Sequence, residues 1–174
     1  MKKNSKIQRM KILLVCSLAA AVLITTGSAA MAADQLSPNE IAEMTKKVVD
    51  ILNAEGKEAF PELRKDEFVH GWAYPTICDL NGQVLFHPIK PKLEGRSLLA
   101  MKDKNGKLFV AELIAVARQK GSGWVDYVWP KPGEKKVSKK VAYVMKGTCD
   151  GVDIMCMVGL YDVTKEFCEK EAGR

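Results

Sequence analysis

The chain has 174 residues, 47% of them hydrophobic, and a formal net charge of +6. This length supports one ordinary globular domain and is too short for two well-packed cores. The hydrophobic fraction is too high for a disordered chain, and no low-complexity tract interrupts the sequence.

The first 32 residues have the pattern of a secretory signal peptide. Five basic residues within positions 1–11 precede an apolar run at 12–24, and small residues follow up to Ala32. The apolar run is shorter than the roughly 18 residues that a membrane-spanning helix needs, which favours a cleaved signal over an uncleaved anchor. We therefore expect cleavage after Ala32 and a single periplasmic or secreted domain over residues 33–174.

Most of the positive charge belongs to this leader. Cleavage leaves 22 of the 27 basic residues, against 21 acidic residues. A net charge near +1 gives no long-range field that would attract nucleic acid. We expect no nucleic-acid partner, and no membrane span once the signal is removed.

Four cysteines remain after cleavage: Cys78, Cys149, Cys156 and Cys168. In an oxidising compartment they form either disulfides, with three pairings that the sequence does not separate, or buried free thiols. If one bridge exists, Cys149 and Cys156 are the preferred pair because they flank a predicted turn. The absence of a C-x-x-C motif argues against a thioredoxin-like redox site.

The first element predicted in the exported part is a helix over residues 36–52. Ser37 has the position of an N-cap, Pro38 that of the first helical residue, and Glu40 that of the residue that bonds back to the cap. Apolar residues then recur at helical spacing. A shorter helical segment is expected near residues 59–63.

Strand-like sequence begins after residue 68. An Asn81-Gly82 turn joins predicted strands over 69–79 and 84–86 into a β-hairpin. The remaining elements are, in chain order, a loop over 88–106, a helix over 107–120, strands over 124–129, 139–146 and 152–161, and a short helix over 164–171. This order predicts an α+β domain on a five-stranded antiparallel sheet.

The sequence offers no enzyme signature. The chain has two histidines, His70 and His87, and it lacks a G-x-S-x-G elbow, a phosphate-binding glycine loop and an H-E-x-x-H motif. No group of residues has metal-ligand spacing. We expect a protein that is not an enzyme and that carries no cofactor or metal.

Aromatic residues gather on the predicted strands. Tyr127 and Trp129 share one strand face with Trp124 on the other, and Trp72 and Tyr74 share a face of the first strand. Rings with a polar tip suit the wall of a small-molecule pocket, because each gives apolar area and a hydrogen bond. The alternative is that these rings fill the core.

The loop over 88–106 supplies cations beside these rings. Arg96 follows Gly95, and its planar guanidinium suits a two-point contact with a carboxylate. A carboxylate clamp and a solvated charge are equally compatible with its position. Lys90 and Lys92 are expected to be solvated.

A series of motifs over residues 68–162 resembles the single Cache domains of extracytoplasmic sensing proteins, in which a long helix also comes first. The motifs are Trp72-Ala-Tyr74, Asp79-Leu-Asn-Gly82, Val84-Leu-Phe-His-Pro88, Pro91-Lys-Leu-Glu-Gly95, Lys102-Asp-Lys-Asn-Gly106, Gly121-Ser-Gly-Trp124, Trp129-Pro-Lys-Pro-Gly133 and Gly159-Leu-Tyr161.

This resemblance implies a PAS-like fold, with a long N-terminal helix packed on the sheet, and a pocket for an organic acid or other small metabolite. The implied ligand-binding positions are Tyr74, His87, Arg96, Trp124, Tyr127, Trp129 and Tyr143. The chain departs from the family at Ile154 and Met155, where an aromatic residue is common.

Family members usually join a kinase or chemoreceptor module, and we expect neither in this chain. We therefore expect a stand-alone sensor domain that binds a small molecule and passes its state to a membrane receptor or kinase partner. The alternative is a periplasmic interaction or structural module with a filled core and no ligand.

Overall fold

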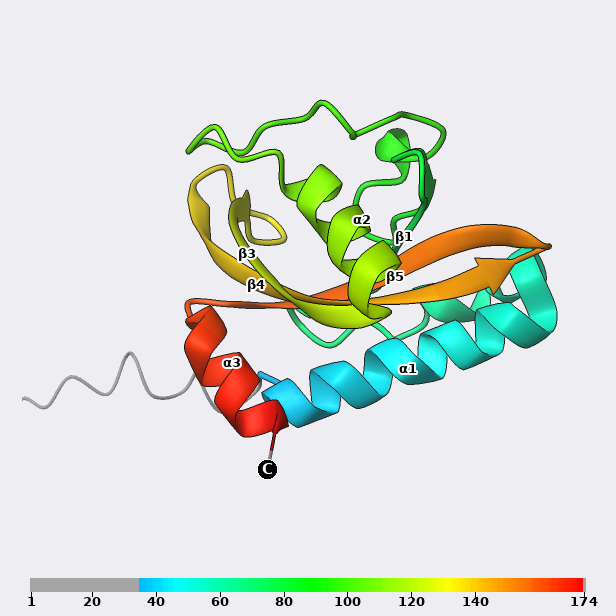
Figure 1. Ribbon diagram of the computed structural model, residues 1–174, viewed down its shortest axis with the longest axis horizontal. Coiled ribbons are helices and arrows are strands. Elements are labelled where there is room, and N and C mark those ends of the chain that lie inside the picture. Colours follow the sequence, from blue (N-terminus) through cyan, green and yellow to red (C-terminus); the bar gives the residue numbers. More distant parts are fainter. Residues whose placement is uncertain (1–34, 174) are drawn as a thin grey trace, which may run out of the picture. The chain divides into compact units, whose positions relative to one another are not determined.

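The computed structural model describes residues 35–173, so the predicted signal peptide lies outside the described part (Figure 1). Its helices are α1 (Pro38–Glu55), α2 (Phe109–Lys120) and α3 (Lys165–Ala172), with 3-10 turns η1 (Gly56–Ala59), η2 (Glu62–Arg64) and η3 (Pro91–Leu93). Its strands are β1 (Thr76–Asp79), β2 (Val84–Phe86), β3 (Ser122–Pro130), β4 (Val137–Cys149) and β5 (Val152–Tyr161).

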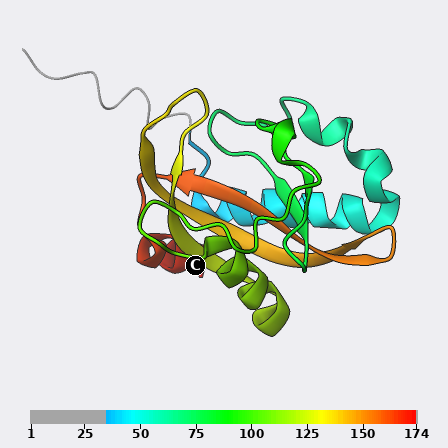
Figure 2. The ribbon, with the colours of Figure 1, turned by 90° about the horizontal axis from the view of Figure 1, so that it is seen from above.

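The five strands form one antiparallel sheet in the order β2-β1-β5-β4-β3. Helix α1 packs on one face, mainly against β4 and β5, and α2 packs on the other face against β3 and β4 (Figures 1 and 2). The predicted α+β, PAS-like class with an N-terminal helix on a five-stranded antiparallel sheet is confirmed. Strand β5, the last in the chain, lies at the centre of the sheet and is buried from Ile154 to Tyr161.

The start of α1 follows the predicted capping pattern. The Ser37 hydroxyl accepts a hydrogen bond from the Glu40 backbone N–H, and the Glu40 carboxylate accepts one from the Ser37 N–H at 2.6 Å. These bonds satisfy two backbone donors that a helix start otherwise leaves free. The buried face of the helix carries Ile41, Val48 and Leu52, which fixes α1 against the sheet.

The first predicted strand is shorter than expected, because residues 69–75 are irregular. A tight turn pairs His70 with Ala73 through two backbone hydrogen bonds, and Gly71 within it has a φ of +56°. Pro75 then has no N–H to give to a strand ladder. The chain therefore joins the regular sheet only at Thr76, and Tyr74 just before it is buried.

The four described cysteines are buried free thiols. The preferred Cys149–Cys156 bridge is wrong, because the β4–β5 register places Cys149 opposite Val152 and Cys156 opposite Met145. Four strand positions correspond to roughly 13 Å, well beyond the reach of a disulfide. Burial raises the pKa of the Cys78 thiol to about 12, which keeps it protonated.

Candidate functional site

An enclosed cavity lies between the sheet, the start of α2 and the loop after β2. It is lined by Tyr74, Thr76, His87, Leu93, Leu98, Phe109, Tyr127, Trp129, Lys140 and Met157. Its free space is about 20 Å³, roughly the room of one water molecule. Side chains from seven separate segments of the chain therefore line this small cavity.

The alternation of β3 places two of the predicted site residues in this cavity. Tyr127 and Trp129 face α2, where the Phe109 ring stacks on Tyr127 with centroids 4.5 Å apart. Tyr74 and His87 join them, with ring centroids 5.3 Å apart. The structure thus brings together four of the seven predicted positions.

The other three predicted positions lie outside the cavity. Trp124 and Tyr143 belong to the opposite face of the sheet, beside α1, with ring centroids 5.0 Å apart. Arg96 is exposed, and its guanidinium has no hydrogen-bond or ion-pair partner among the described residues. Its backbone carbonyl accepts a hydrogen bond from the Val84 N–H, which holds this residue along the sheet edge.

Lys140, on β4, is the cavity residue that sequence reasoning missed. It is 4% exposed, and its Nζ lies 3.2 Å from the Tyr74 hydroxyl oxygen. The same Nζ lies 4.3 Å from the centroid of the Tyr74 ring and 4.9 Å from that of Tyr161. No carboxylate within residues 35–173 forms an ion pair with this ammonium group. Lys140 is therefore a buried cation without a counter-charge.

Strand alternation is the signal that could have identified Lys140. Residues 140, 142 and 144 lie on one face of β4, and Ala142 and Val144 are apolar and buried. Gly159 on the neighbouring strand makes room for the long side chain, since a methyl group there would collide with Cε of Lys140. Of the two adjacent lysines, Lys139 is exposed and Lys140 is buried.

His87 contributes a neutral donor to the cavity. Its Nδ1 accepts a hydrogen bond from the Lys90 N–H at 3.0 Å, which assigns the proton to Nε2. Burial first, and then the positive charges of Lys140 and Lys90, lower the pKa of His87 to about 4. His87 as a whole is 3% exposed.

Lys90 adds a second positive charge near the cavity. Its Nζ lies 4.8 Å from the centroid of the Trp129 ring, a cation–π contact, and the residue is partly buried. The expectation that Lys90 is solvated is therefore wrong. Burial raises the pKa of Tyr74, but the positive charges of Lys140 and Lys90 and hydrogen bonds to the hydroxyl together outweigh burial and lower this pKa.

Two contacts of Glu94 fix the loop that follows β2 beside the cavity. Glu94 accepts a hydrogen bond from the His87 N–H at 2.9 Å and pairs with Arg64 of η2 at 2.7 Å. Leu93 and Leu98 of this loop line the cavity.

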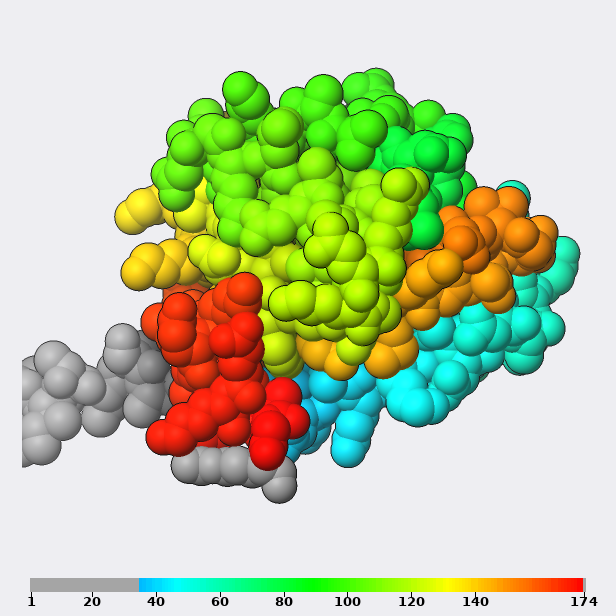
Figure 3. Space-filling model, in the orientation of Figure 1, coloured from blue at the N-terminus to red at the C-terminus, as the bar shows by residue number. Residues whose placement is uncertain are grey.

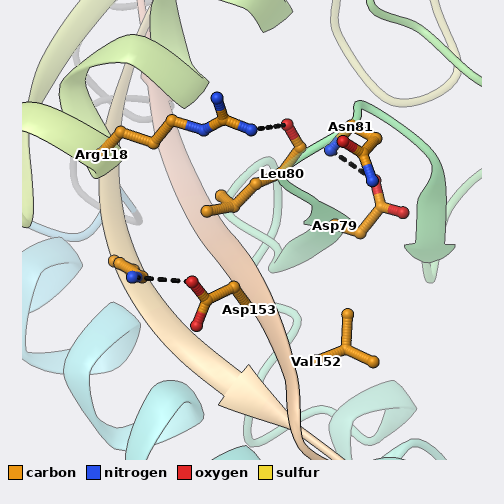
Figure 4. A pocket seen from close by; sticks show the side chains of 7 residues that line it. Asp79, Leu80, Asn81, Arg118, Val152 and Asp153 are labelled. Atoms are coloured by element: carbon orange, nitrogen blue, oxygen red, sulfur yellow. Dashed lines mark hydrogen bonds and ion pairs between the residues drawn. The ribbon is translucent and has the colours of Figure 1, made fainter.

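A second hollow, open to solvent, lies where α2 ends near the β1–β2 turn (Figure 4). Arg118 donates a hydrogen bond to the Leu80 carbonyl, and Lys146 pairs with Asp153 at 2.8 Å. Asp79 accepts from the Asn81 N–H. The charged groups of this hollow thus bond to one another or to the backbone, unlike Lys140.

No helix between residues 35 and 173 is long and apolar enough to cross a membrane. The same residues contain no cluster of three His, Cys, Asp or Glu side chains that would hold a metal ion.

Comparison with known proteins gives a consistent result. A family model described as Single Cache domain 2 matches residues 26–172. The methyl-accepting chemotaxis protein McpP of Pseudomonas putida is 35% identical over 108 residues, 62% of this chain and 19% of that protein. The sensor histidine kinase MctS of Rhizobium johnstonii is 32% identical over 72 residues, 41% of this chain and 15% of that protein. The chain thus spans less than a fifth of the length of either relative.

Three solved structures of chemosensory proteins are also similar to this chain. One, described as the structural basis for carboxylic acid recognition by a Cache chemosensory domain, has a TM-score of 0.60 and 27% identity, covering 80% of this chain and 100% of that one. A periplasmic sensor domain of a chemotaxis protein has a TM-score of 0.56 and 30% identity, covering 72% and 88%. A methyl-accepting chemotaxis protein from Vibrio parahaemolyticus has a TM-score of 0.57 and 25% identity, covering 70% and 83%.

Proposed function

The chain belongs to the Single Cache domain 2 family, and we propose that its cavity binds a small organic carboxylate outside the cytoplasm. It is homologous to sensor domains of chemotaxis receptors and of a histidine kinase. This family has a sensory role rather than an enzymatic one.

The buried ammonium group of Lys140 is the observation that carries the proposal. Removing a charge from water without a partner is costly, and proteins compensate such charges with an opposite charge or with hydrogen bonds. Here the described residues supply a tyrosine hydroxyl and two ring faces, but no anion. A bound carboxylate would provide the missing charge.

The position of His87 favours a carboxylate ligand over a monatomic anion such as a halide. Its Nε2–H is a second donor on the cavity wall, and a carboxylate has two oxygens to accept from two donors. One oxygen would pair with Lys140 and the other with His87. The rings of Tyr127 and Trp129 would then contact the hydrocarbon part of the ligand.

The small free space favours a short ligand. The cavity has free space for about one water molecule. A ligand of a few carbon atoms would therefore fit only if Leu93 and Leu98 moved outward. The solved Cache domain described for carboxylic acid recognition supports this ligand class by similarity. Of the predicted ligand-binding residues, the proposal retains Tyr74, His87, Tyr127 and Trp129, adds Lys140, and omits Arg96, Trp124 and Tyr143.

Thermal unfolding of residues 33–174 with acetate, propionate or butyrate tests this function. A ligand at about 100 times its dissociation constant stabilises the folded state by about 2.7 kcal/mol, which raises the melting temperature by about 8 °C for a domain of this size. Sodium chloride at equal ionic strength and the matching amines are the controls. Absence of a shift with every short carboxylate would contradict the proposal.

The location outside the cytoplasm depends on the proposed signal peptide. Expression of all 174 residues in a bacterial host with intact secretion is expected to give a periplasmic protein that begins at Ala33. Mass spectrometry of the purified protein measures this start directly. A protein that retains residues 1–32 would instead support a membrane anchor.

A filled interaction module remains the second candidate, because the cavity as it stands holds so little space. In that case the domain would pass information through contacts with a membrane partner and would show no thermal shift. The carboxylate series therefore separates the two functions.

A further inference from the structure

Three side chains from distant parts of the chain form what we call the Lys131 clamp: Lys131, Asp162 and Trp72. The Lys131 Nζ lies 2.6 Å from Oδ2 of Asp162 and 3.9 Å from the centroid of the Trp72 ring. The Lys131 side chain is 12% exposed, much less than a surface lysine. The clamp therefore joins the β3–β4 turn, the end of β5 and the segment before β1.

The clamp contacts the proposed ligand cavity through Tyr161. The Trp72 and Tyr161 rings meet edge to face with centroids 6.2 Å apart, and the Lys140 ammonium group lies over the Tyr161 ring. The Tyr161 hydroxyl donates a hydrogen bond to the Pro130 carbonyl at 3.0 Å, next to Lys131. One aromatic residue thus touches the cavity cation and the clamp.

The clamp also fixes the start of α3. Asp162 has a φ of +60°, a conformation that residues other than glycine rarely adopt, and its N–H donates to the Lys139 carbonyl. Thr164 caps α3 two residues later. Helix α3 lies against β3 and the start of α1, as the space-filling view shows (Figure 3). The contacts that fix Asp162 therefore also fix the position at which α3 begins.

We propose that Lys131 is a positioning residue that couples occupancy of the cavity to the position of α3. This coupling rests on the proposed binding of a carboxylate at Lys140. The Lys131 ammonium group lies over the Trp72 ring and that of Lys140 over the Tyr161 ring, and these two rings are in contact. The two like charges repel each other, so each opposes the contact of the other with its ring. A carboxylate on Lys140 neutralises one of them and strengthens the clamp.

Amide hydrogen exchange of the ligand-free protein tests the clamp itself. Lys131→Met keeps the length of the side chain and removes its charge, and we expect exchange over residues 162–168 to accelerate about fivefold. The matched control is Lys146→Met, which breaks a Lys–Asp pair of similar length elsewhere on β4 and β5. Unchanged exchange in Lys131→Met, or equal acceleration over 162–168 in the control, overturns the clamp.

The same measurement with propionate tests the coupling. In the wild-type protein and in Lys146→Met, propionate is expected to slow exchange over residues 162–168, whereas in Lys131→Met the slowing is lost although the thermal shift by propionate remains. Slowing that persists in Lys131→Met overturns the coupling. If propionate gives neither slowing nor a thermal shift in the wild type, the proposed ligand class fails, and the ligand-free comparison still decides whether the clamp holds α3.

Asp162→Asn gives a second variant in case Lys131→Met folds poorly. Asparagine tolerates the left-handed conformation at this position and removes the charge that holds Lys131. It is expected to accelerate exchange over residues 162–168 in the same way. Because Asp162 is 57% exposed, high salt should reproduce part of the effect in the wild type and none of it in Asp162→Asn.

Discussion

Replacement of Lys140 by methionine is expected to weaken the binding of a short carboxylate about 100-fold, measured by titration calorimetry. The substitution removes a charge-assisted contact of about 2 to 3 kcal/mol inside a cavity from which water is largely excluded. Methionine is apolar and only one atom shorter, so it fills most of the space of the lysine side chain while removing the ammonium group that lies over the Tyr74 and Tyr161 rings.

The same substitution should not destabilise the ligand-free protein. Because Lys140 has no carboxylate partner in the described part of the chain, its replacement removes an uncompensated buried charge, and the free energy of unfolding should stay constant or rise. Lys139→Met, at the exposed neighbouring position, is the matched control and should change neither quantity. Arg96→Ala should leave affinity unchanged as well. Full binding by Lys140→Met would exclude the proposed site.

The second large effect concerns His87 and pH. Its pKa is about 4 in the folded protein, whereas a histidine in an unfolded chain has a pKa near 6.5. The unfolded state therefore binds more protons between these values, so His87 contributes stability above pH 6.5 that is lost as the pH falls toward 4. Between pH 7 and pH 5 the expected loss is about 2 kcal/mol.

Urea unfolding at a series of pH values measures this loss. His87→Asn keeps an acceptor for the Lys90 N–H and removes the titrating group, so its stability should depend much less on pH in this window. His70→Asn, at the other histidine, which is exposed, is the control and should retain the wild-type dependence. A wild-type stability that is flat from pH 7 to pH 5 would show that His87 is not held neutral by burial.

The local parts of the fold were predictable because nearby residues determine them. The Ser37, Pro38 and Glu40 pattern marks the start of α1, and the alternation of Trp124, Tyr127 and Trp129 assigns the faces of β3. These features depend on backbone geometry over a few residues. They needed no knowledge of which strands pair.

The missed features depend on pairing between distant segments. The family resemblance placed Trp124 and Tyr143 in one pocket with Tyr127, although Trp124 lies on the other face of β3 and Tyr143 of β4 pairs with it there. The Cys149–Cys156 bridge failed because the register of β4 on β5 was not known. Lys140 was overlooked because its burial depends on another strand: Gly159 on β5 leaves the room that the lysine side chain occupies.

The position of β5 in the sheet has a consequence for how the domain forms. This strand contacts β1 on one side and β4 on the other, yet it is the last of the five to be synthesised. Until residue 161 has left the ribosome, β1–β2 and β3–β4 are two separate hairpins, and isolated hairpins are at best marginally stable in water. The nascent domain therefore stays open until β5 has emerged, and a truncation before residue 152 would leave two unjoined halves rather than a smaller domain.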